Sequence, residues 1–108
     1  MPQLDVQYTG DLEIDAKDIL GSVETLVKEH DSGTGNVKGR ALKVADFHHS
    51  SLMLTLSLVK RPHRDDAFMS ALAADLSDLL GSKISQPCNV SLTVQFLPQF
   101  HVSKDYNS

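Results

Sequence analysis

The fold becomes apparent in the stretch PQLDVQY, residues Pro2 to Tyr8, where apolar and polar side chains alternate. Leu4, Val6 and Tyr8 point to one face and the residues between them to the other, which is typical of a half-buried β-strand. The turn residues Thr9-Gly10-Asp11 end the alternation. A strand of this kind buries only one side, so the rest of the chain must supply its cover.

Working outward from this strand, the order of strand, helix and strand occurs twice. The expected elements are a strand at Pro2–Tyr8, a helix from Asp15 to His30, strands at Val37–Phe47 and Leu52–Val59, a helix from Asp65 to Gly81, a strand at Val90–Phe96 and a short extended piece at Phe100–Val102. Each half is expected to be a crossover unit, in which two parallel strands are joined by a covering helix.

The predicted fold class is α+β, with a four-stranded sheet and both helices on one face, in a single domain over residues 1–108. The other face of the sheet is then uncovered. It carries Met53, Val59 and Phe47 among Ser, Thr and Gln residues. A mixed surface of this kind is better covered by another subunit than by water, so we expect an oligomer.

The composition excludes several classes of function. The formal net charge of -4 argues against a nucleic-acid-binding footprint. No apolar run reaches the length needed to span a membrane, and the N-terminus has no secretory signal pattern. The one cysteine, Cys88, cannot form an internal disulfide, and this fits a cytoplasmic setting.

Pro2 is the first candidate for chemistry. If Met1 is removed, the nitrogen of Pro2 becomes a secondary amine instead of an amide. An ordinary α-amino group titrates at a pKa of about 7.7–8.0, and nearby cations or partial burial lower that value. A neutral amine near neutral pH is a competent general base. A start of Met-Pro is weak evidence alone, because many proteins begin this way.

Four longer stretches of the sequence support a chemical role for Pro2. They are the start from Met1 to Leu12, Val37-Lys38-Gly39-Arg40 with its strand ending Val44-Ala45-Asp46-Phe47, Leu54-Thr55-Leu56 with its arginine-containing loop, and Val90 to Pro98. Over nearly the whole chain this diffuse pattern resembles the 5-carboxymethyl-2-hydroxymuconate isomerase family of the tautomerase superfamily. The resemblance implies a β-α-β-β-α-β tautomerase-like subunit, assembled as a homotrimer.

The resemblance also implies a cofactor-free isomerase that moves a proton in a small unsaturated oxo- or hydroxy-carboxylate, with no metal ion. It assigns the base to Pro2 and a catalytic arginine to Arg40. Lys38 stands where the family often has a second basic residue. The second arginine position falls in the loop Lys60-Arg61-Pro62-His63-Arg64, where Arg61 and Arg64 compete as substrate-binding residues.

Other motifs are read as structural. His48-His49 is expected to be a turn and not a metal site, because adjacent strand residues point to opposite faces. Ser32-Gly33-Thr34-Gly35 lacks the Lys-Ser/Thr of a phosphate-binding loop. Two alternatives stay open: an inactive trimeric tautomerase-fold protein with an interaction or regulatory role, and a ferredoxin-like small-molecule sensor. Lys38, and the absence of a glycine near Arg61, favour the first of these.

Overall fold

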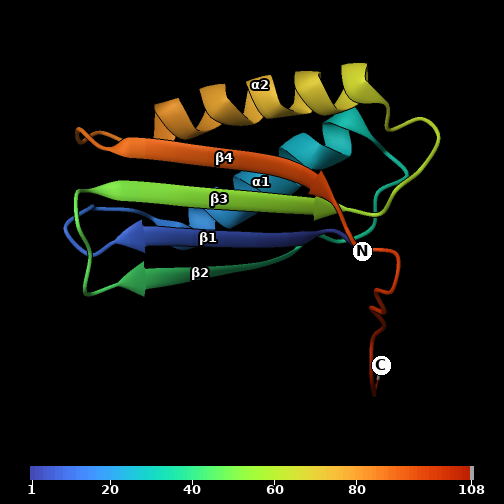
Figure 1. The fold of residues 1–108 in the computed structure, drawn as a ribbon, viewed down its shortest axis with the longest axis horizontal. Coiled ribbons are helices and arrows are strands. Elements are labelled where there is room, and N and C mark those ends of the chain that lie inside the picture. Colours follow the sequence, from blue (N-terminus) through green and yellow to red (C-terminus); the bar gives the residue numbers. More distant parts are fainter. Residues whose placement is uncertain (108) are drawn as a thin grey trace.

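The computed structural model describes residues 1–107 and has the expected element order (Figure 1). Strand β1 covers Gln3–Thr9, helix α1 Ala16–His30, strand β2 Lys38–Val44, strand β3 Ser51–Leu58, helix α2 Asp66–Lys83 and strand β4 Asn89–Phe96. The strands form one sheet in the order β2-β1-β3-β4. The β1–β2 and β3–β4 pairs are parallel and the central β1–β3 pair is antiparallel, which confirms two crossover units side by side.

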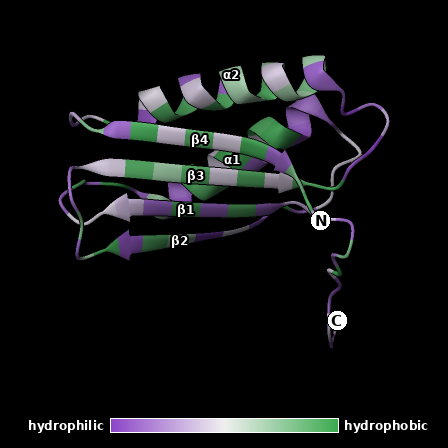
Figure 2. Cartoon of the chain, viewed as in Figure 1, coloured by the Kyte–Doolittle hydropathy of each residue, from purple (hydrophilic) through white to green (hydrophobic). Residues whose placement is uncertain are grey.

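One face of the sheet is covered by both helices. Strand β3 contributes a leucine at every second position, four in all, and these side chains point toward the helices. Apolar residues at helical spacing on α1 and α2 pack against them. The buried apolar residues are Leu4, Val6, Leu12, Ile19, Val23, Val27, Leu52, Leu54, Leu56, Leu58, Leu72, Leu76 and Leu80. Figure 2 shows the alternation along the strands and the apolar stripes of the helices. Burial of these side chains is the main stabilising contribution, at about 1.5–3 kcal/mol for each fully buried large one.

Both helices begin at an aspartate, as the sequence predicts. The Asp15 carboxylate accepts a hydrogen bond from the Asp18 N–H, and the Asp65 carboxylate accepts one from the Phe68 N–H. Each cap satisfies an amide that the first helical turn leaves without a partner. The N-terminus of α2 is thereby fixed directly after the basic loop of residues 60–64.

Two expected boundaries and one expected element were wrong. The second strand ends at Val44 and not at Phe47, because residues 45–50 bend into the connection to β3. Helix α2 continues through Gly81 to Lys83, since Gly81 keeps a negative φ and nothing obstructs it. The segment Phe100–Val102 forms no strand; it begins the C-terminal tail, with Phe100 and Val102 exposed and His101 partly buried (Figure 1).

The second face of the sheet has no helix over it. Pairing of Gln7 with Leu42 and with Met53 places these two apolar side chains on that face, where 59% and 46% of their surfaces are exposed. We call this surface the open face. Within residues 1–107, no helix is long and apolar enough to cross a membrane.

Candidate active site

The strand directions bring all the predicted site residues toward one end of the sheet. Strands β1 and β2 begin there, and β3 and β4 end there (Figure 1). The α1–β2 loop, residues 31–37, and the β3–α2 loop, residues 59–65, close the same end. We call it the Pro2 end of the sheet. The opposite end carries the turn with His48 and His49.

Pro2 is buried at the start of β1. Its carbonyl accepts a hydrogen bond from the Lys38 N–H at 2.9 Å, so the first residues of β1 are fixed to β2. The side chain of Met1 packs toward the α1–β2 loop, since a Cβ on Gly35 would lie 3.7 Å from its Cγ. While Met1 is attached, the Pro2 nitrogen is an amide and has no basic lone pair.

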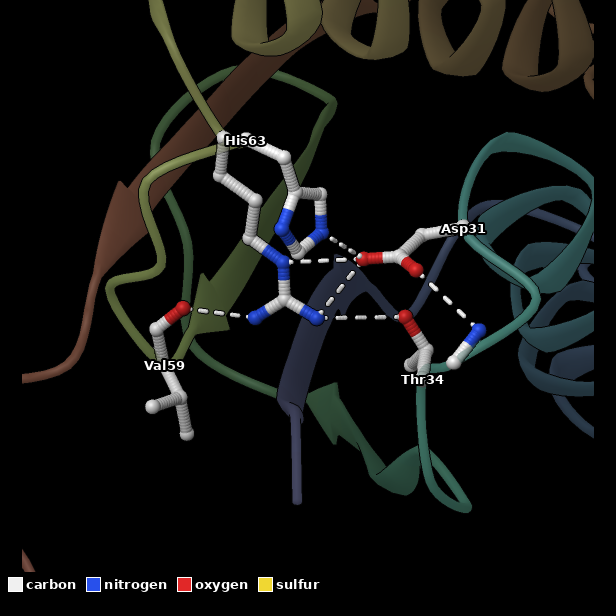
Figure 3. Close-up of polar contacts among 6 residues, drawn as sticks. Asp31, Thr34, Val59 and His63 are labelled. Carbon is white, nitrogen blue, oxygen red and sulfur yellow. Dashed lines mark hydrogen bonds and ion pairs between the residues drawn. The ribbon is translucent and has the colours of Figure 1, made fainter.

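Arg64 is the most constrained of the five predicted residues. Its side chain is 7% exposed and uses all three nitrogens. Nε and Nη2 donate to Oδ2 of Asp31 at 3.1 and 3.0 Å, Nη1 donates to the Val59 carbonyl at 2.6 Å, and Nη2 also donates to Oγ1 of Thr34 at 3.2 Å (Figure 3). The guanidinium therefore joins the two loops of the Pro2 end and leaves little capacity for a ligand.

Asp31 is the acceptor at the centre of this cluster. His63 Nε2 lies 2.7 Å from Oδ2, and the Gly33 N–H donates to Oδ1 at 3.1 Å (Figure 3). The hydrogen bond from His63, followed by that from Arg64, lowers the pKa of Asp31 from 3.8 to about 2, against the opposing effect of burial. Asp31 is therefore ionised throughout the neutral range.

Arg61 has the opposite environment, although it lies in the same loop. It is exposed and lines a cavity of about 730 Å³ together with Lys60, Phe96 and the first residues of α2. The Lys60 ammonium lies 5.9 Å from the centre of the Phe96 ring. No carboxylate within residues 1–107 forms an ion pair with Arg61 or Lys60. The residues that line this cavity do not include Pro2.

The same cavity also carries negative charge. Asp65 and Asp66 line it, and the Asp65 carboxylate is engaged with the Phe68 N–H. The cavity thus offers two exposed cations, Lys60 and Arg61, beside an apolar ring, and its two carboxylates oppose the binding of an anion.

Lys38 and Arg40 lie on the open face, because they pair with Gln3 and Asp5 of β1. Arg40 donates to Asp5 at 2.9 Å and to Gln3 at 2.7 Å, and more than half of its side chain is exposed. Lys38 lies 3.7 Å from the Asp105 carboxylate of the tail. Within one chain, then, Arg64 and the N-terminus both contact the α1–β2 loop. Lys38 and Arg40 face away from the helices.

Three residues at this end were not predicted from the sequence. Asp31 reads as an ordinary loop residue, and Lys60 as part of a basic turn. His101 gives no signal in the sequence, yet its Nε2 is buried with no hydrogen-bond partner in the described part of the chain. The excess of cations in residues 60–64 was the one signal that could have identified Lys60. Across residues 1–107, no three His, Cys, Asp or Glu side chains are grouped to hold a metal ion.

The fold is that of the tautomerases. A 5-carboxymethyl-2-hydroxymuconate isomerase from Deinococcus radiodurans R1 is 17% identical, with a TM-score of 0.66 over 98% of this chain and 90% of that one. A fused 4-OT wild-type symmetric trimer is 14% identical, with a TM-score of 0.75 over 94% and 90%. Pt0534, inactivated by 2-oxo-3-pentynoate, is 17% identical, with a TM-score of 0.68 over 94% and 91%.

These solved structures share the architecture of the chain over nearly its whole length. The low sequence identities limit the comparison to the fold. No protein family matches the sequence, and a search of curated proteins finds no match either.

Proposed function

We propose that this chain is a cofactor-free tautomerase acting on a small unsaturated oxo- or hydroxy-carboxylate, with Pro2 as the general base. The observation that carries the proposal is the position of Pro2. It directly precedes β1, one of the two central strands of a tautomerase fold, at the end of the sheet that also holds the basic loop of residues 60–64.

In the proposed reaction, Met1 is first removed and the Pro2 nitrogen becomes a secondary amine. The amine takes a proton from the hydroxyl or carbon of the substrate and returns it to another carbon of the conjugated chain, so the net change is the position of one proton. The ring of Pro2 and the hydrogen bond from Lys38 to its carbonyl hold the direction of the lone pair. General base catalysis by a positioned group contributes about 10²–10⁴-fold.

Arg61 is the residue we assign to the substrate carboxylate, with Lys60 beside it. Both cations are free of carboxylate partners in the described residues, and both line the 730 Å³ cavity. A guanidinium binds a carboxylate through two parallel hydrogen bonds, which fixes the substrate as well as attracting it. Positioned cations also stabilise the enolate charge that develops as the proton leaves.

Lys38 and Arg40 are assigned to a site that two subunits share. The open face exposes Leu42 and Met53 beside these cations, and this surface suits a neighbouring copy better than water. We therefore propose a homotrimer, in which Arg40 of one subunit serves the Pro2 of the next. Size-exclusion chromatography with light scattering tests this, and a monomer at micromolar concentration contradicts it.

Ketonisation of 2-hydroxymuconate or phenylenolpyruvate tests the proposed function. The wild type, with loss of Met1 verified by intact mass spectrometry, is compared with Pro2→Ala processed in the same way. The expected result is a fall in kcat/KM of about 10²–10⁴-fold. Equal rates for the two proteins would rule out Pro2 as the base. A second reagent for the same atom is 2-oxo-3-pentynoate, an alkynyl oxo acid whose triple bond accepts an amine nucleophile.

One observation favours a second candidate function, a trimeric protein of this fold without catalysis: two of the predicted site arginines, Arg40 and Arg64, are already paired with Asp5 and Asp31. With Met1 in place, Pro2 is buried and its nitrogen is an amide. A chain that keeps Met1 in the cell has no base at this position, and its open face remains available for assembly or regulation. Intact mass spectrometry of the protein purified from its native cells separates the two candidates, because only the enzyme requires the mass without methionine.

A further inference from the structure

We infer that Asp31 is a positioning residue for the proposed reaction: through Arg64 and His63 it holds the loop under the N-terminus and the loop that carries Arg61 in one fixed arrangement. The inference rests on the proposed function for its consequence in catalysis. It also assigns different roles to the two arginines, with Arg61 binding the substrate and Arg64 holding the loops.

The place of Asp31 in the chain is the first argument. It is the C-terminal cap of α1, where its N–H donates to the Val27 carbonyl. A negative charge near the C-terminus of a helix is unfavourable, because it lies beside the negative end of the helix dipole. The side chain is also only 11% exposed. A buried carboxylate at an unfavourable position requires strong partners, and Arg64 and His63 supply them.

The contacts of Arg64 are the second argument. It is held by Asp31 and Thr34 of the α1–β2 loop and by the Val59 carbonyl at the end of β3 (Figure 3). The α1–β2 loop leads directly into Lys38, whose N–H donates to the Pro2 carbonyl at 2.9 Å, a contact that does not depend on Met1. On the other side, Arg61 lies three residues before Arg64, and its carbonyl accepts the Arg64 N–H at 3.0 Å. One ion pair therefore links the base and the proposed carboxylate-binding arginine.

The chain offers a matched control in a second histidine–carboxylate pair. His30 Nε2 lies 2.7 Å from Oδ2 of Asp75, the same separation as in the His63–Asp31 pair. Both histidine rings also meet the edge or face of Phe68, at 6.3 and 6.1 Å between ring centres. Asp75, however, connects α1 to α2, is 53% exposed, and forms no hydrogen bond or ion pair with either loop of the Pro2 end within residues 1–107. Asp75→Asn removes the same chemical group without releasing those loops.

The experiment compares Asp31→Asn, Arg64→Lys and Asp75→Asn in the full-length, Met1-free protein. Leu79→Ala serves as a further control that loses stability by loss of packing on α2. Each variant is studied at a temperature where circular dichroism shows it folded. Two quantities are measured: hydrogen exchange of the Lys38 amide, which bonds to the Pro2 carbonyl, and kcat and KM for 2-hydroxymuconate across the pH range.

We expect Asp31→Asn to speed exchange of the Lys38 amide and to lower kcat by at least roughly tenfold, because small displacements of reacting groups are costly. The pH profile of kcat/KM should shift as the Pro2 amine changes surroundings. Arg64→Lys keeps the charge but loses the planar guanidinium. Its kcat and its rate of Lys38 amide exchange should therefore lie between those of Asp31→Asn and the wild type. Asp75→Asn and Leu79→Ala should leave kcat and the pH profile unchanged.

A purely structural role for Asp31 gives a different result, a lower melting temperature with kcat, KM and the pH profile unchanged. That outcome would overturn the inference. If Asp31→Asn does not fold, Arg64→Lys decides the question by the same readouts. If the wild type has no tautomerase activity, the proposed function fails, while the exchange of the Lys38 amide still tests whether Asp31 fixes the N-terminal strand.

Discussion

The two ends of the sheet differ in how their polar groups are satisfied. At the end opposite Pro2, the Ser50 hydroxyl donates to the Asp11 carboxylate, and the Gln86 side chain bonds to the backbone of Asp11 and Glu13. The centres of the His48 and His49 rings lie 4.1 Å apart with the ring planes tilted by 49°, and the cavity there is about 230 Å³. The polar side chains named here are satisfied by hydrogen bonds within this end of the sheet.

The Pro2 end combines a group of paired charges with a group of cations that have no ion-pair partner in the described residues. Asp31 and Arg64 fix its loops, whereas Arg61 and Lys60 face a cavity about three times larger with no ion-pair partner in the described residues. Exposed cations that line a large cavity can bind an anion, and this cavity lies at the same end of the sheet as Pro2. Within one loop, a cation held by an ion pair, Arg64, and an exposed cation, Arg61, therefore lie three residues apart.

The largest effect that separates the two ends should come from Arg61→Ala. Loss of charged hydrogen bonds to the substrate carboxylate should lower kcat/KM by about 10- to 100-fold. Lys43→Ala removes an exposed cation at the opposite end of the sheet and should leave kcat/KM unchanged. Steady-state kinetics on the two variants measure this difference, and a greater effect of Lys43→Ala would contradict a substrate-binding role for Arg61.

The next effect concerns stability in acid. The pKa of Asp31 is lowered from 3.8 to about 2 by its contacts with His63 and Arg64, so its contribution is complete above pH 3.8 and is lost as pH falls through about 2. This contribution is about 2 kcal/mol. Urea unfolding from neutral pH downward should show Asp31→Asn less stable at neutral pH, with the difference closing in that window.

Asp11 provides the comparison at the opposite end. Its pKa is also lowered, by hydrogen bonds from Ser50 and then Thr9, but its side chain is exposed. Water screens such a group, so Asp11→Asn should change the acid dependence less than Asp31→Asn does. A larger change for Asp11→Asn would contradict the assignment of the anchoring role to the Pro2 end.

The smallest predicted effect is a gain. Asp66 lines the cavity with Arg61 and opposes an incoming anion. Asp66→Asn keeps the size of the side chain and removes its charge, so KM should fall roughly twofold while kcat is unchanged. The effect should shrink at high salt, because added ions screen an exposed charge. A rise in KM would instead indicate that Asp66 helps to bind the substrate.

The fold could be predicted because its signals are local. The alternation in β1 and β3 and the helical stripes of α1 and α2 depend on residues within a few positions of one another. The end of β2 at Val44 and the continuation of α2 through Gly81 were missed, because composition alone does not show where a chain bends or whether a glycine adopts a helical φ.

The site could be predicted only in part. Cations near residues 38–40 and 60–64 were visible in the sequence, but the difference between Arg61 and Arg64 depends on Asp31, about thirty positions earlier. That contact forms only after α1 and β3 end at the same edge of the sheet. The face on which Arg40 lies likewise follows from its pairing with Asp5 across two strands, which no local pattern specifies.

The most direct test of the central claim is the identity of the atom that 2-oxo-3-pentynoate modifies in the Met1-free protein. Peptide mapping by mass spectrometry should place one adduct per chain on the nitrogen of Pro2, and Pro2 should be protected by 2-hydroxymuconate. Pro2 that remains unmodified, with reagent found instead on Cys88 or on lysines, would contradict the assignment of a reactive amine to the start of β1.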